Sequence, residues 1–270
     1  MTSEVIAAMS AAVRIRRMNS TLATLRNERR ISQLELALRV GVSQRHLSCI
    51  ETGRAKPSRP MLIAVLDALE APLPERNRAL LAAGFAPAYA ETDLDDPAMA
   101  PVRKALTHLL DAHDPAPALV MDGAWNLLLA NKGMRGLIRL LGADPATHLV
   151  PGFNLLRACL KPGGFGEACV NREQVAAALW QRANSEAIHV PALKAMLEEL
   201  RPHVPKALPL EPSTPLLHTT LRTTAGELSF FSAFTTFGTP LDVTVASLRV
   251  EHFFPADDAT RRAMAAAASD

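Results

Sequence analysis

The stretch SQLELALRVGVSQRHLSCIETGRAKPS, residues 32–58, consists of two short amphipathic runs separated by Val-Gly-Val. Ser32 and Ser43 precede the two runs at positions where a serine hydroxyl would cap a helix, and apolar residues follow at helical spacing. Gly41 and Gly53 follow the runs, where a residue in the left-handed conformation would end each helix. This pattern predicts two short helices joined by a tight turn.

The second predicted helix begins with side chains that hydrogen-bond well to nucleic-acid bases. In a helix-turn-helix, the N-terminal residues of the second helix enter the DNA major groove, where Gln pairs with adenine and Arg with guanine. The residues expected to face the bases are Ser43, Gln44, Arg45, His46 and Ser48. The residues expected at the phosphates are Gln33, Arg54 and Lys56, with Arg26 or Arg59 as further contacts. The residues expected to pack behind the helix are Leu34, Ala37, Leu47 and Ile50.

The charge of the chain is divided unevenly along its length. The net charge of the 270 residues is only +2. Residues 1–90 hold 13 Lys and Arg against 7 Asp and Glu, whereas residues 91–270 hold 16 against 20. A basic front part joined to a mildly acidic rear part favours a polyanion-binding domain followed by a domain with another task. A small helical bundle with a charged face is the alternative.

Several classes of function are disfavoured by what the sequence lacks. The 3 cysteines are scattered and form no CxxC, which argues against a disulfide framework and a zinc site. GxSxG, P-loop and HExxH motifs are absent, and the histidines lack ligand spacing. No apolar run approaches the ~20 residues of a membrane span, and the N-terminus lacks the order of a secretory signal. We therefore expect a cytoplasmic protein that is not an enzyme, with no metal and no cofactor.

The rear of the chain mixes helical and strand patterns. The predicted helices are 102–114, 132–142, 171–187 and 191–203, with a short one within 151–168. The predicted strands are 117–122, 126–131, 216–224, 227–237 and 243–254, and the last residues are expected to fray. Apolar residues on both faces of 228–237 indicate a strand covered on both sides. The fold class is therefore α+β, with an all-α N-terminal domain and a mixed C-terminal domain that contains an antiparallel sheet.

The front of the chain resembles the phage-repressor-like (XRE/Cro) helix-turn-helix family. The resemblance rests on the Gln, Ala, Gly-Val-Ser, Leu-Ser, Glu, Gly and Pro-Ser positions of residues 32–58, which follow the family pattern without gaps. It covers about residues 19–84 and implies that Gln33, Ser43, Gln44, Arg45 and Ser48 face DNA. It also implies that Glu51 is a structural residue rather than a base reader.

The rear of the chain resembles the MmyB-like regulators, which join such a head to a PAS-like ligand-binding domain. The resemblance rests on PALVMDGAWNLLLANKGMRGLIRLLG (117–142), with Trp125 in a hairpin and Asn131 opening a helix, and on TTFGTPLDVTVASLRVEHFFPAD (235–257). AAGFAPAY (82–89) also fits. The resemblance implies a small apolar ligand, with fatty-acid or acyl-type molecules as the leading class.

The candidate residues for an apolar pocket are the aromatic ones of the rear: Trp125, Trp180, Phe230, Phe234 and Phe253. Alternatively, these aromatic side chains simply fill the core. Arg157 and Arg172 are candidates for holding a ligand carboxylate, and the alternative for each is an ordinary surface charge.

The sequence as a whole favours a homodimeric one-component transcription regulator. We expect an N-terminal extension (1–18), a DNA-binding domain (19–88), a linker (89–100), a ligand-sensing and dimerisation domain (101–258) and a tail (259–270). The alternative is a ligand-independent dimeric repressor whose C-terminal domain only mediates oligomerisation. The operator, the sign of regulation, the identity of the ligand and the role of residues 1–18 stay open.

Overall fold

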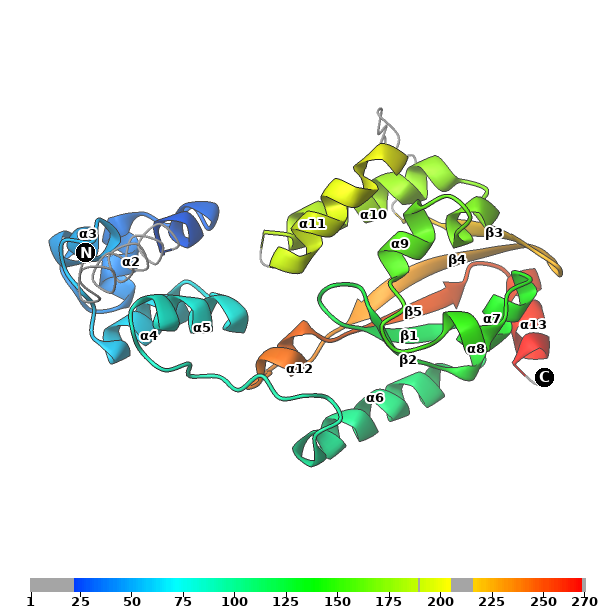
Figure 1. Cartoon of the computed structure of the whole chain (residues 1–270), viewed down its shortest axis with the longest axis horizontal. Helices are drawn as coiled ribbons and strands as arrows, with labels where there is room; N and C mark the ends of the chain where they lie inside the picture. The colour runs from blue at the N-terminus through cyan, green and yellow to red at the C-terminus, as the bar shows by residue number, and fades with distance from the viewer. Residues whose placement is uncertain (1–21, 189, 205–215, 269–270) are drawn as a thin grey trace, which may run out of the picture. The chain divides into compact units, whose positions relative to one another are not determined.

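The computed structural model describes residues 22–188, 190–204 and 216–268, which form two compact units (Figure 1). The first unit contains residues up to 91 together with 241–246, and the second contains 92–240 and 247 onward. The predicted extension 1–18 lies outside the described residues, as do Asn19 and Ser20, where the sequence favours the cap of a first helix. Among the helices that the structure describes, none has both the length and the apolar character needed to cross a bilayer.

The first unit is a bundle of short helices around one apolar core. A helical segment over 22–28 is followed by α2 (Gln33–Arg39), α3 (Gln44–Glu51), α4 (Arg59–Ala68) and α5 (Leu73–Ala82). As predicted, Ser32 and Ser43 cap α2 and α3: their hydroxyls accept from the backbone N–H groups three residues on, at 3.0 and 3.1 Å. Gly41 and Gly53 have φ of 73° and 76°, which is the left-handed turn that the sequence predicts.

Two details of this bundle differ from the sequence prediction. Leu34, expected in the core, is 53% exposed, and its place is taken by Leu36, which is fully buried beside Ala37. The reason is the phase of α2, which turns the Leu36–Ala37 side of the helix inward. The apolar run MLIAVLDAL (61–69) predicts a helix that starts at Met61, but α4 begins at Arg59, because Ser58 caps it and its early proline occupies the first turn.

Part of the predicted linker is ordered. A short 3-10 helix, η1 (Pro97–Met99), leads directly into α6 (Ala100–His113). Earlier in this segment, the carbonyl of Ala90 accepts a 2.8 Å hydrogen bond from the N–H of Val243, so residues 241–246 return to the first unit.

The second unit is built on a five-stranded antiparallel sheet with strand order β2-β1-β5-β4-β3. Its strands are β1 (Ala118–Met121), β2 (Leu127–Ala130), β3 (Thr219–Thr223), β4 (Gly226–Thr235) and β5 (Arg249–Pro255). Its other elements are α7 (Lys132–Leu140), α8 (Pro145–His148), α9 (Leu155–Leu160), η2 (Phe165–Ala168), α10 (Arg172–Glu186), α11 (Pro191–Leu200), η3 (Arg201–His203) and α13 (Asp258–Ala267). The predicted α+β fold class is thereby confirmed.

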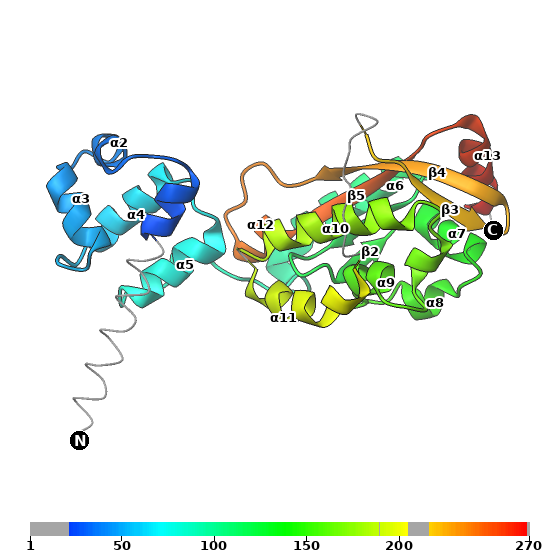
Figure 2. The ribbon, with the colours of Figure 1, turned by 90° about the horizontal axis from the view of Figure 1, so that it is seen from above.

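Alternate residues of the central strands face two different layers. Leu119 and Met121 of β1 point into the larger core, which α7, α9, α10 and α11 cover. Ala118 and Val120 point to the opposite face, which packs against α6 (Figures 1 and 2). Because side chains alternate between the two faces of a strand, Leu119 and Met121 belong to one core and Ala118 and Val120 to the other.

The side chain of Asn131 connects α6, β1 and α7 through four hydrogen bonds. Its side-chain oxygen accepts from Met134 N and from Ala118 N, at 2.9 and 2.8 Å, and so caps α7 and fixes the start of β1. Its amide nitrogen donates to the carbonyls of Leu110 and Ala116. Asn131 makes these four bonds although it is only 4% exposed. The bond from Met134 N confirms the helix start predicted at Asn131.

Three predictions for the C-terminal third are wrong. The strand expected over 243–254 begins with a helical turn, α12 (Val243–Ser247), and only β5 is extended. The last residues form α13, with Thr260 and Met264 fully buried, because they cover the end of the sheet beside α7. The β4 strand is not covered on both sides: it continues beyond its pairing with β3, and residues 232–235 are exposed.

Candidate DNA-binding helix and ligand cavity

The α3 helix presents its polar entrance to solvent and its apolar side to the core. Leu47 and Ile50 are fully buried, whereas the predicted base readers Ser43, Gln44, Arg45 and His46 are exposed. Ser48, the fifth predicted reader, is half-buried. The structure thus places four of the five residues on one accessible end of a helix, as a major-groove contact requires.

A buried ion pair fixes this helix against its neighbours. Arg26 donates to Glu51 from Nε and Nη2 at 2.7 and 3.0 Å, and Gln33 Nε2 donates to the same carboxylate at 2.7 Å. Arg26 also donates to the carbonyl of Ile31. Its side chain is only 12% exposed, so its proposed role as a phosphate contact is wrong: the guanidinium is occupied inside the bundle. The structural role expected for Glu51 is confirmed.

The remaining predicted phosphate contacts lie at the edges of this surface. Gln33 is half-buried at the first turn of α2, with its amide turned to Glu51. Arg54, Lys56 and Arg59 are exposed after α3. Lys56 places its ammonium 5.6 Å from the centre of the Phe85 ring, a cation–π contact that limits its range.

The second unit contains an apolar cavity of about 130 Å³ between the sheet and its helices. Its floor is formed by β1, β3 and β5, and its walls by α7, α9, η2 and α10. The lining residues are Leu119, Met134, Leu137, Ile138, Leu141, Leu149, Phe153, Leu155, Cys159, Phe165, Gly166, Cys169, Arg172, Val175, Ala176, Leu179, Thr219, Leu221 and Phe253. Such a lining suits an apolar ligand body.

Of the five aromatic residues predicted for a pocket, only Phe253 lines this cavity. Phe230 is fully buried and Trp180 packs against the same core, so both serve the packing that was the alternative expectation. Trp125 is 2% exposed, and Phe234 is 37% exposed with its ring centre 3.4 Å from the Arg182 guanidinium carbon. The rest of the lining comes mainly from Leu, Ile and Met on helices, whose sequence pattern is that of any other core residues.

Trp125 belongs instead to a polar cluster. Its Nε1 donates to Glu186 Oε2 at 2.7 Å, and Arg182 and Arg249 approach Oε1 of the same carboxylate at 2.8 and 2.5 Å. Burial acts to raise the pKa of Glu186, but the bonds from Arg249 and Arg182 outweigh it and hold that pKa below its usual value. The cluster ties the β1–β2 hairpin to α10 and β5.

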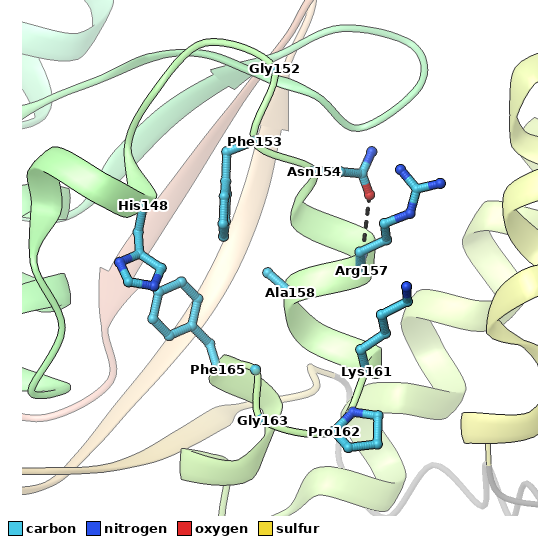
Figure 3. Close-up of a pocket in the computed structure, with 11 residues that line it drawn as sticks. His148, Gly152, Phe153, Asn154, Arg157, Ala158, Lys161, Pro162, Gly163 and Phe165 are labelled. Atoms are coloured by element: carbon cyan, nitrogen blue, oxygen red, sulfur yellow. Dashed lines mark hydrogen bonds between the residues drawn. The ribbon is translucent and has the colours of Figure 1, made fainter.

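An open cleft of about 420 Å³ lies beside the cavity (Figure 3). Phe153 and Phe165 line both spaces, with ring centres 6.2 Å apart. On the other side of the cleft stand Arg157 and Lys161, and both pair with Glu199. Hydrogen bonds from these two cations lower the pKa of Glu199 to about 2. The charges of the cleft are thus largely satisfied within the protein.

Two cysteines line the cavity, and neither is activated. Burial raises the pKa of the Cys159 thiol to about 12, with Glu251 and Cys169 adding to the effect. Burial also raises the pKa of Cys169, against the lowering influence of Asn171 and Arg172. Both therefore remain protonated at neutral pH and act as small apolar groups. Within the described ranges, no group of three or more His, Cys, Asp or Glu is placed to hold a metal ion.

Comparisons with known proteins agree with these two sites. The MmyB-like transcription regulator ligand binding domain matches residues 102–267, and a helix-turn-helix domain matches residues 20–79. No curated protein matches the chain. A solved structure titled "Structure of an RNA-binding Light-Oxygen-Voltage Receptor" aligns with 100% of this chain and 67% of its own, at 15% identity and a TM-score of 0.26. That similarity carries no conclusion.

The first of these matches spans more than half of the chain and contains the apolar cavity, while the second contains α2, the turn and α3. The protein therefore belongs to the MmyB-like transcription regulators, with a helix-turn-helix DNA-binding domain and a ligand-binding domain.

Proposed function

We propose that this regulator is an XRE-type cytoplasmic homodimer whose DNA binding responds to a small apolar ligand of the acyl type, with fatty acids as the leading class. Residues 19–88 bind DNA, 89–100 link, and 101–258 form a PAS-like sensing and dimerisation domain. The observation that carries the proposal is the cavity: an apolar space within the domain that matches a ligand-binding family.

The DNA-binding half of the proposal rests on α3. Gln44 and Arg45 are exposed at the first turn of a helix that is held from behind by Leu47, Ile50 and Glu51. A base-contacting helix held in this way loses little conformational entropy when it enters the major groove. In a two-fold dimer the two copies of α3 would read half-sites ~34–36 Å apart or a multiple of that distance.

The sensing half rests on the lining of the cavity. A ligand regulates DNA binding only by the difference in its affinity for two arrangements of the protein, typically ~5- to 150-fold. The cavity sits under α7, α9 and α10, so a ligand inside it contacts several helices at once. We propose no catalytic activity for it, because its two thiols are held protonated.

A ligand-independent dimeric repressor is the second candidate. Its specific support is the size of the cavity, about 130 Å³, which is below the ~300–1,000 Å³ of most small-molecule sites. In that function the helices around the cavity would serve only the core and the dimer.

The experiment that separates the two begins with native mass spectrometry of the purified full-length chain, before and after extraction with organic solvent. An operator selected from random duplexes is then titrated with the protein, with and without acyl carboxylates, by fluorescence anisotropy. Release of an acyl mass from a dimer, together with a ligand-dependent change in operator affinity, supports the sensor. A dimer without adduct whose operator affinity never changes supports the repressor.

A further inference from the structure

One lining residue of the apolar cavity carries a charge. Among the described residues that line it, the others are apolar or neutral, and only Arg172 is a charged residue type. Arg172 is half-buried, so part of its side chain reaches solvent, and an arginine at the edge of an apolar space is placed to pair with an anion that enters it. Whether Arg172 is available to an anionic ligand depends on whether another residue of the protein already pairs with it.

Within the described parts of the chain, the guanidinium of Arg172 has neither a hydrogen bond nor an ion pair, although the residue is half-buried. Its positive charge acts to lower the pKa of the nearby Cys169 thiol. Arg157, the other candidate predicted for a carboxylate, is in the opposite situation. It pairs with Glu199 at the surface, where its Nε and Nη2 donate to Oε2 at 3.2 and 2.6 Å. Of the two candidates, only Arg172 has its donors available.

Arg172 is also the first residue of α10, a helix of 15 residues. Asn171 stands at the cap position but provides no side-chain cap. Its amide group instead donates to His218 O at 2.6 Å and accepts from Thr220 N at 3.1 Å, and so fastens β3 to the helix start. In the described part of the chain, no side chain caps the first turn of α10, and the partial positive charge of this helix end favours an anion next to Arg172.

The size of the cavity limits the rest of the ligand. Its volume of about 130 Å³ is close to that of an engineered cavity of roughly 150 Å³ that binds benzene. An apolar body of about six carbons fills such a space. Phe153 and Phe165 line both this cavity and the outer cleft, so a longer chain that extends toward the cleft would contact these rings.

We propose that the cavity binds a compact monocarboxylate, with a short acyl chain or a single ring inside and the carboxylate on Arg172 at its edge. The inference rests on the proposed sensing function and narrows the class of ligand to an anion. Arg172 is the residue that determines the preference for a carboxylate over a neutral group. The carboxylate would take up the free guanidinium donors in the bidentate geometry that this pair favours.

The test compares two ligands of equal length, hexanoate and hexan-1-ol, by isothermal titration calorimetry on the intact protein. The wild type is expected to bind hexanoate ~10- to 100-fold more tightly than the alcohol, which is the usual effect of hydrogen bonds to a charged group. Arg172→Gln should remove this preference and leave hexan-1-ol binding unchanged. Arg157→Gln is the matched control and should keep the preference.

Three results would overturn the inference while leaving the proposed sensing function intact. The first is a wild type that binds the alcohol as tightly as the carboxylate. The second is a preference lost in Arg157→Gln and kept in Arg172→Gln, which would place the carboxylate in the outer cleft. The third is an Arg172→Gln variant that loses both ligands alike, which would show that the arginine is structural. Binding of neither ligand, nor of any longer acyl compound, would instead refute the proposed sensing function itself.

A chain-length series tests the size of the ligand. From butanoate to hexanoate the affinity should rise about fourfold for each added methylene, as each one leaves water. Beyond about seven carbons, counting the carboxyl carbon, the rise should stop, because the apolar chain then fills the cavity. A rise that continues to dodecanoate would refute the compact ligand and support a long-chain fatty acid.

Discussion

Arg26 donates two hydrogen bonds to Glu51, one over 2.7 Å from Nε and one over 3.0 Å from Nη2, and thereby joins the first helical segment to α3. Both side chains are nearly buried, at 12% and 4% exposure. Removal of one partner from such a pair leaves an uncompensated charge, which costs far more than the loss of a surface pair.

Glu51→Gln should therefore destabilise the first unit by about 3 kcal/mol. Urea unfolding of the full chain reports this through helical circular dichroism. The sequence has 2 tryptophans, Trp125 and Trp180, and both lie in the second unit, so their fluorescence transition should not move.

Glu35→Gln is the control for this experiment. Glu35 pairs with Arg39 one turn away on α2, with both side chains almost half exposed. Such a pair contributes only about 0.3–0.5 kcal/mol. Equal shifts for the two variants would show that the buried pair has no special role.

Substitutions on and after α3 should separate specific from general DNA binding. Arg45→Ala removes an exposed side chain of the first turn and should weaken operator binding by about 1–3 kcal/mol, with sequence preference lost at one position. Arg54→Ala should instead weaken operator and random DNA about equally and reduce the salt dependence. Anisotropy titrations against both duplexes check this. Equal losses on both duplexes for Arg45→Ala would contradict its role as a base reader.

The helix-turn-helix could be predicted from sequence because its signals are local. A serine that caps a helix, or a glycine that ends one, acts on backbone groups within four residues, so Ser32, Ser43 and Gly41 behave as expected. The phosphate contact predicted for Arg26 is wrong because the interaction that occupies its side chain is not local. Its partner Glu51 is 25 residues away, and only the packing of the bundle brings the two together.

The cavity could not be predicted because it depends on gaps between elements rather than on residue type. The aromatic residues expected there fill space elsewhere, as Phe230 does in the core. The lining comes from helices whose apolar stripes would look the same over a solid core. Arg172 was identified as a candidate anchor from its charge, but its difference from Arg157 depends on Glu199, which lies 42 residues from Arg157 in the sequence.

Gly136 should be irreplaceable where α7 crosses α13. A Cβ atom at this position would lie 2.8 Å from the carbonyl oxygen of Ala267, and a backbone atom cannot move aside cheaply. Although alanine favours helices by about 1 kcal/mol over glycine, we expect Gly136→Ala to destabilise the second unit by about 1–3 kcal/mol. Thermal unfolding followed by tryptophan fluorescence measures the change.

Gly238→Ala provides the comparison for Gly136, because a Cβ atom at Gly238 meets nothing within 4 Å. Its effect should stay within about 0.5 kcal/mol. If Gly136→Ala proves as stable as this control, α13 does not pack tightly on α7.

Glu251 should make the stability of the second unit depend on pH. It lies on β5 between Leu119 and Phe234 of the neighbouring strands, and burial raises its pKa to about 7, against the lowering effects of the Ser232 hydrogen bond and the Arg182 charge. The unfolded carboxyl has a pKa near 4.3. Between these two values the folded chain keeps a proton that the unfolded chain has lost, so this group makes stability fall as pH rises from about 4.3 to about 7.

Glu251→Gln removes this titration and should make the unfolding midpoint in urea at pH 8 closer to the midpoint at pH 5 than it is in the wild type. His252, whose pKa is lowered by burial and by His113, acts in the opposite direction near its own pKa but is present in both proteins. Glu199→Gln is the control. The pKa of Glu199 is lowered to about 2, so its contribution changes only below about pH 4.3 and cannot alter the comparison between pH 5 and pH 8. If the Glu251 variant and the wild type show the same difference between the two pH values, the carboxyl is ionised in the folded protein and its surroundings are wetter than their packing indicates.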